Sequence, residues 1–274
     1  MGLNVNTNVA AFNTSRVLRR STLALNRSLE RLSSGLRINR AADDAAGLAI
    51  AEGLRAQVRG FQQAQRNAQD GISLVQTAEG ALSETTNIIQ RIRELAVQSA
   101  NGTQTGATRA SLQGEVVQLI TQIDDIAART TFNGVVLLNG STASVVLQSG
   151  INAGQTTSVT LGDARAVTLG IDTGSIDIST QAGASAAITA VDTALTTVTT
   201  LRGGLGAAQN RLEFTINTLG IQVENSLSSE SAIRDADIAL ETITFTRNQI
   251  LVTAGTSILA QANLVPQTAL QLLG

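Results

Sequence analysis

Leucines near the start of the chain outline an amphipathic helix. They recur every seven residues at Leu18, Leu25 and Leu32, and Leu29 and Leu36 fill the alternate positions four residues after Leu25 and Leu32. This spacing is typical of a coiled-coil seam, which buries one face of a helix against a partner helix. We expect the helix to begin at about Thr14 and to need one partner.

The stretch SSGLRINRAADDAAG, residues 33–47, separates this helix from the next one. Gly35 is a suitable helix stop, because glycine adopts the left-handed conformation that ends many helices. Asp43 or Asp44 can serve as the N-cap of the following helix, because an aspartate side chain accepts from the free N–H groups of the first turn. The stretch therefore reads as a joint between two helices.

Two further helices follow the joint. From Ala45 to about Asn101, apolar residues form two neighbouring stripes at sevenfold spacing, one from Phe61 to Ala96 and one from Leu74 to Leu95. Adjacent stripes make a broad face, which favours a bundle of three or four helices. The connection NGTQTG breaks the pattern, and a third, antiparallel helix should run to about Arg129.

Residues 131–182 have a different pattern. Five short β-branched runs alternate with Gly, Asn and Asp turns: FNGVVLLNG, SVVLQ, TTSVTLG, RAVTLGI and SIDIST. Such runs predict about five strands arranged as hairpins.

Helical spacing resumes at Ile188 and continues to Val223, which predicts the last rod of the bundle. Gly203, Gly204 and Gly206 lie within it and mark either a weak point or a point of close packing. The glycines do not match a dinucleotide-binding fingerprint, because no strand precedes them and their spacing differs.

The last segment, residues 231–274, is apolar on two opposite sides of a helix. One side contains Ala236, Leu240, Ile243, Ile250, Ala254 and Ile258, and the other contains Ile238, Phe245, Val252 and Leu259. A single chain offers one partner helix to this segment. The second side should therefore be covered by neighbouring molecules.

Composition removes most enzymatic chemistry. The 274 residues contain no His and no Cys, and all 19 basic residues are arginine. Without these side chains the chain has no Ser-His-Asp triad, no cysteine nucleophile, no usual zinc site and no Walker-type lysine. The pairs Asp43-Asp44 and Asp124-Asp125 read as helix caps and surface charges rather than as a catalytic acid and base. We predict no catalytic, cofactor or metal site.

Charge is distributed unevenly. Residues 1–42 contain seven arginines and one acid, a net charge of +6, whereas four acids and two arginines from Glu230 onward give −2. The two ends of the chain should therefore pair. Nucleic-acid binding is disfavoured, because no aromatic residues interleave with the arginines and the total charge is slightly negative.

No cleavable signal peptide is visible, and no run reaches the roughly 18 apolar residues of a membrane span. We therefore expect no membrane insertion.

Three function classes remain: a structural polymer, a signalling coiled coil of the chemoreceptor type, and an enzyme. The two-sided last helix and the missing catalytic side chains favour the polymer, and strands at 131–182 would argue against the signalling coiled coil.

Blocks at both ends resemble bacterial flagellin, the subunit of the flagellar filament. They include LERLSSGLRINRAADDAAGLAIAEGLRAQVRG, RNAQDGISLVQTAEGAL and QRIRELAVQSANGT near the N-terminus, and LGAAQNRLEFTINTL, RDADIALE, FTRNQIL and ILAQANLVPQTALQLLG near the C-terminus. The resemblance implies a mostly α fold, in which residues 1–44 and 231–274 form an inner coiled-coil domain. Residues 45–230 would form a rod-like helical bundle with the β-hairpin insert at 131–182. The short middle implies a thin, smooth filament without outer domains.

The resemblance also implies a location and partners. Subunits would be exported unfolded to an extracellular flagellum, with an export chaperone, a filament cap and hook-junction proteins as partners, and would form a homopolymer. Vertebrate Toll-like receptors would read the monomer at Arg91, Leu95 and Glu115. The predicted assembly residues are Leu18, Leu25, Leu29, Leu32, Leu36, Ile238, Leu240, Ile243, Phe245, Ile250, Val252, Ile258 and Leu259.

Overall fold

A computed structural model describes residues 7–271, with side chains described as far as Leu264. Its contacts divide the chain into two compact units. Unit 1 contains the residues up to Gln57 and those from Glu224 onward, and unit 2 contains residues 58–223. The mostly α fold with a small β-hairpin region is confirmed.

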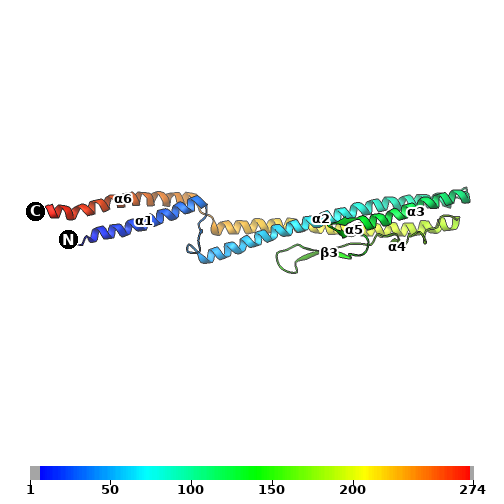
Figure 1. Cartoon of the computed structure of the whole chain (residues 1–274), viewed down its shortest axis with the longest axis horizontal. Helices are drawn as coiled ribbons and strands as arrows, with labels where there is room; N and C mark the ends of the chain where they lie inside the picture. The colour runs from blue at the N-terminus through cyan, green and yellow to red at the C-terminus, as the bar shows by residue number, and fades with distance from the viewer. Residues whose placement is uncertain (1–6, 272–274) are drawn as a thin grey trace. The chain divides into compact units, whose positions relative to one another are not determined.

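In unit 1, helices α1 (Val9–Ser34) and α6 (Ile238–Gln271) lie side by side, with the start of α1 and the end of α6 at the same end of the pair (Figure 1). The first turns of α2 (Ala45–Ala100) and the last turns of α5 (Gln181–Arg234) complete the unit. Gly35 ends α1 at φ 71°, as expected of a glycine stop. Asp44 caps α2 by accepting from the N–H of Gly47 at 2.8 Å.

In unit 2, α2 and α5 run beside α3 (Gly106–Arg129) and share one core with it (Figure 1). The apolar stripes predicted from sequence lie in this core, and Leu82, Ile89 and Ala96 are fully buried. Thr105 caps α3 through its hydroxyl, which accepts from the N–H of Thr108. The loop between α2 and α3 is short, as NGTQTG predicted.

The middle segment contains two hairpins and a short helix. Strands β1 (Thr131–Phe132) and β2 (Val135–Val136) pair through a two-residue turn, in which both Asn133 and Gly134 have positive φ. Strands β3 (Ser144–Gln148) and β4 (Thr156–Thr160) form a longer antiparallel pair, with Val146 opposite Ser158. The longer hairpin lies on α2, because Leu147 occupies the space that a side chain at Gly71 would need.

The prediction of five strands is wrong for its last two runs. RAVTLGI contains the short helix α4 (Ala166–Leu169), which ends at Gly170. SIDIST forms no strand. Its Ile176 and Ile178 are fully buried, and their backbone groups bond to side chains: Ile176 O and Ile178 N to Gln113, and Ile178 O to Ser99. The β-branched pattern reflected burial against helices rather than pairing between strands.

The glycine cluster of α5 does not interrupt the helix. Residues 181–234 form one continuous helix through Gly203, Gly204 and Gly206. An added Cβ at any of these three glycines would meet no neighbouring atom, so the interpretation as a close-packing point is wrong.

Candidate functional site

The acidic side chains singled out in the sequence can be followed in the structure. Within residues 7–271, no group of three or more acidic side chains could hold a metal ion. The acidic pairs have structural roles: Asp124 accepts from the N–H of Ala166 at 2.8 Å, and Asp125 pairs with Arg129 at 3.2 Å. Asp43 accepts from the backbone N–H groups of Arg40 and Asn39, and these bonds lower the pKa of its carboxyl.

No helix between residues 7 and 271 combines the length and the apolar character that crossing a bilayer requires. The most distinctive surface among the described residues belongs to the pair of α1 and α6, whose line of mutual contact is the seam predicted from the leucines.

Three contacts fix the antiparallel register of α1 and α6. Asn8 Nδ2 donates to Ala262 O at 2.7 Å, and Arg31 pairs with Glu241 at 3.5 Å. Between these ends, Leu18 lies against Gly255. The predicted pairing of α1 with α6 is therefore confirmed. Among the described residues, Arg31 and Glu241 form the one ion pair between these two helices.

Small residues line the seam together with the leucines. Ser21 and Ser28 are the buried residues of α1, and Leu18, Leu25 and Leu32 are half-buried beside them. On α6, Phe245, Val252 and Leu259 are half-buried. Serine and glycine at a helix contact allow the two backbones to approach closely.

The joint holds the exit of α1 beside the entry of α6. Leu36 forms a β-bridge with Asp235, and the N–H of Ala236 donates to Gly35 O at 2.9 Å. Arg37 donates from its N–H to Arg234 O and from its guanidinium to Ile233 O. Asp237 then caps α6 by accepting from the N–H groups of Ala239 and Leu240.

The second apolar side of α6 is open to solvent. Ile243 and Ile250 are 58% and 62% exposed, and Leu240 and Ile258 lie on the same side with similar exposure. Of the predicted assembly residues, one group forms the seam: Leu18, Leu25, Leu32, Phe245, Val252 and Leu259. A second group is exposed: Leu29, Ile238, Leu240, Ile243, Ile250 and Ile258. Leu36 is half-buried at the joint.

The structure brings together two of the three predicted receptor residues. Arg91 on α2 donates to Glu115 on α3 at 2.9 Å and to Glu94 at 2.9 Å, and the two carboxylates raise the pKa of its guanidinium. All three side chains are substantially exposed. Leu95 instead lies in the core with 1% exposure, so a partner cannot touch it while unit 2 is folded.

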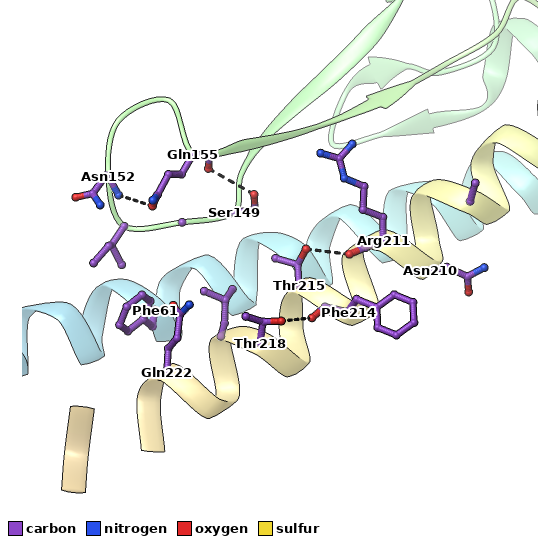
Figure 2. Close-up of a pocket in the computed structure, with 14 residues that line it drawn as sticks. Phe61, Ser149, Asn152, Gln155, Asn210, Arg211, Phe214, Thr215, Thr218 and Gln222 are labelled. Atoms are coloured by element: carbon purple, nitrogen blue, oxygen red, sulfur yellow. Dashed lines mark hydrogen bonds between the residues drawn. The ribbon is translucent and has the colours of Figure 1, made fainter. Parts of the chain in front are cut away.

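A groove of about 850 Å³ lies in unit 2 between the β3–β4 loop and α5, and sequence reasoning missed it. Figure 2 shows Phe61 below the loop that carries Asn152 and Gln155, and Phe214 farther along on α5. Asn152 N donates to Gln155 Oε1, and the hydroxyls of Thr215 and Thr218 donate to backbone carbonyls of α5. Arg211 is the one charged side chain of this lining, so the groove offers no acid–base pair.

Comparison with known proteins places these features in a family. Residues 5–143 match the model of the bacterial flagellin N-terminal helical region, and residues 188–273 match that of the C-terminal helical region. Flagellin of Bacillus subtilis is 46% identical over an alignment that covers 99% of this chain and all of that protein. The flagellar filament 33 kDa core protein of Treponema phagedenis is 44% identical, with 98% of this chain and 99% of that protein covered.

Among solved structures, the crystal structure of Bacillus cereus flagellin matches with a TM-score of 0.51 and 35% identity, over 56% of this chain and 88% of that one. The hairpins in residues 131–160 also distinguish the fold from a signalling coiled coil. With both helical regions matched and relatives similar along nearly the whole length, the chain belongs to the flagellin family.

Proposed function

We propose that this protein is a structural subunit that polymerises into the extracellular filament of a bacterial flagellum and thereby serves swimming motility. One observation carries the proposal: α6 is apolar on two sides, and α1 covers only one of them. Exposed apolar side chains on ordinary protein surfaces are usually isolated, whereas here they form an aliphatic row of Leu240, Ile243, Ile250 and Ile258. Burial of this row against other copies would lower the free energy of the assembled state.

In this proposal, residues 1–44 and 231–274 form the inner domain of the filament and residues 45–230 form the domain outside it. The compact units support a division of this kind, although their limits lie at Gln57 and Glu224. Within unit 1, ion pairs of Arg55 with Glu230 and of Arg234 with Glu52 join the start of α2 to the end of α5.

The full chain tests the proposal directly. Ile243→Ser together with Ile250→Ser should abolish filaments in negative-stain micrographs without changing the stability of the monomer, because both side chains are already exposed. A matched control, Val146→Ser with Val167→Ser, changes two exposed apolar residues of unit 2 and should leave filaments intact. A chain trimmed to residues 45–230 should remain soluble and monomeric. Filaments from the α6 variant would contradict the proposal.

The same surface supports a proposal about partners in export. We propose that an export chaperone holds the C-terminal segment 231–274 before assembly, and that cap and hook-junction proteins contact the ends of the filament. The exposed row of α6 supports the first of these, because it would otherwise aggregate before export. Size-exclusion chromatography with the chaperone of the same bacterium should show co-elution that Ile243→Ser and Ile250→Ser together weaken. Unchanged co-elution would argue against it.

We propose that vertebrate Toll-like receptors read the monomer at the Arg91–Glu115 pair. The two residues are exposed and joined across α2 and α3, which gives a partner a fixed charged feature. Leu95 would act only by supporting the position of Arg91 from the core. Arg91→Glu should weaken receptor signalling by the monomer, whereas Arg93→Glu, two residues away and paired with Asp192, should not. Equal signalling by both variants would remove the claim.

A further inference from the structure

The charges of unit 1 are separated along the α1–α6 pair. We call residues 7–29 and 242–271 the distal end, and residues 30–57 and 224–241 the proximal end. The distal sequence contains five arginines and no acid: Arg16, Arg19, Arg20, Arg27 and Arg247. The proximal sequence contains nine acids and five arginines, a net charge of −4. Unit 1 is therefore cationic at one end and anionic at the other.

The distal arginines face solvent, and the structure gives them no ion pair among the described residues, although Arg16 donates to Asn13 Oδ1 at 2.9 Å. Arg16, Arg20 and Arg27 recur at helical spacing on the side of α1 opposite the leucine seam, and all five distal arginines are exposed. Among the described residues, none of the five has a carboxylate within 4 Å. Four of the five proximal arginines differ, because Arg31, Arg40, Arg55 and Arg234 form ion pairs.

The proximal end holds acids that its own arginines do not neutralise. Glu224, Asp235 and Asp237 are exposed and form no ion pair among the described residues. Asp235 accepts from the hydroxyl of Ser231, and Asp237 caps α6, so both carboxylates are held in place at the joint. An exposed cationic row thus lies at one end of unit 1, and exposed carboxylates lie at the other.

We propose that these two ends bind each other between copies, so that charge sets the axial offset of neighbouring subunits. The inference rests on the proposed polymer. Two parallel copies without an offset would place arginines against arginines, which is repulsive. An offset of about 20 Å, from the 1.5 Å rise over the 13 residues between the middle of the arginine row and the end of α1, places arginines against the acids of the joint.

In this proposal, apolar contact holds copies together and charge selects their axial position. The aliphatic row of α6 cannot select an axial position, because apolar contact is not directional. Charge complementarity distinguishes one register from another and accelerates encounter. A second copy is therefore the occupant that the charges fit, since it brings the opposite charge at the other end of its own unit 1.

Salt gives the first test, in seeded elongation of full-length protein followed by light scattering. Elongation should slow as NaCl rises from about 20 to 300 mM, because the Debye length falls from roughly 20 Å to about 6 Å. Assembly driven by apolar contact alone would be unchanged or faster, because salt does not weaken apolar burial.

Charge reversal gives the second test. Arg16→Glu with Arg20→Glu should slow elongation at low salt at least about tenfold, the effect of one lost favourable contact of ordinary strength. Adding Glu224→Arg and Asp235→Arg in the same chain reverses both ends and should restore the rate to within about threefold, because complementarity returns. A matched control, Arg59→Glu with Arg66→Glu, makes the same change of net charge on exposed arginines of unit 2 and should elongate normally.

The outcomes separate this inference from the proposed function. If wild-type protein forms no filaments, the proposed function fails. The charge assignment fails, and the proposed polymer is unaffected, under either of two results with wild-type filaments growing normally. In the first, the variant with Arg16→Glu and Arg20→Glu elongates like the control. In the second, the variant with all four charge reversals elongates as slowly as the variant with two.

Discussion

Unit 2 and the α1–α6 pair are built from similar apolar patterns, yet the patterns produce different degrees of burial. In unit 2, three long helices and the middle segment surround one another, and Leu82, Ile120 and Val191 are at most 1% exposed. In the α1–α6 pair each helix has one neighbour, so the seam leucines are half-buried and the outer side of α6 is open. The number of neighbours, rather than the sequence pattern, decides how much apolar surface leaves water.

This difference in burial indicates that the two regions contribute differently to folding and to assembly. Burial of apolar side chains is the main favourable contribution to folding. In unit 2 this burial can offset the conformational entropy that the chain loses, so unit 2 can fold by itself. The helices of the pair gain less burial per residue and depend on further contacts. Stability therefore resides in unit 2, and the capacity to bind other copies resides in unit 1.

Hydrogen exchange should show the largest contrast. In verified monomer, amides of the core stretch Ile89–Leu95 should exchange about a thousandfold more slowly than those of Arg16–Leu25, because local opening follows burial. Assembly should then protect residues 1–40 and 235–274, as expected when folding is coupled to association. Strong protection of these terminal residues in monomer, checked by ultracentrifugation, would contradict the comparison.

Truncation of one leucine in each region should give unequal losses. Leu82→Ala removes a fully buried side chain and should lower the free energy of unfolding by about 2 to 5 kcal/mol. Leu25→Ala removes a half-buried one and should cost the monomer under about 1 kcal/mol. Urea unfolding monitored by circular dichroism measures both. Equal losses would mean that the pair is as well packed as the core.

A polar contact in unit 2 should produce a smaller, pH-dependent effect. Arg165 and Thr168 donate to Asp163 and hold the pKa of its carboxyl at about 2, below its usual 3.8. Because the folded pKa is lowered, this stabilisation is present above pH 4 and is lost as the pH falls toward 2. Asp163→Asn should cost about 1 to 2 kcal/mol at pH 7, with the partial exposure of the carboxyl allowed for.

Urea unfolding at pH 7 and pH 2 checks this expectation. The stabilities of wild type and Asp163→Asn should converge at the lower pH. Asp125→Asn, which removes an exposed partner of Arg129, is the control and should show a smaller pH dependence. A constant difference between wild type and Asp163→Asn would contradict the assignment.

Alkali should have the smallest effect. Every basic side chain is arginine, whose charge persists where lysine is neutralised, so filaments should survive at pH 10 to 11. Arg31→Lys replaces the cation that pairs with Glu241 across the seam and should make filaments slightly more sensitive near pH 11. Sedimentation of filaments across this range measures the effect. Dissociation of wild type near pH 10 would argue against a role for persistent charge.

Predictions from sequence succeeded where a residue's role depends on its immediate neighbours in the chain. Gly35 and Asp44 act locally as a stop and a cap, and both were identified. Failures came where a distant element decided the outcome. The run SIDIST has the composition of a strand, but Gln113 and Ser99 bind its backbone and leave no partner strand. Leu95 lies in the same motif as Arg91, yet it faces the core.

The sequence by itself determined the long helices, their apolar faces, the exclusion of most catalytic chemistry and the unequal charge of the chain ends. These follow from spacing and residue type, which no distant contact can change. Only the tertiary structure decided which apolar face of α6 meets α1, which arginines find carboxylates and which acids stay exposed at the joint. Those outcomes depend on the antiparallel register of α1 and α6, and contacts of Asn8 and Arg31 with residues more than 200 positions away fix that register.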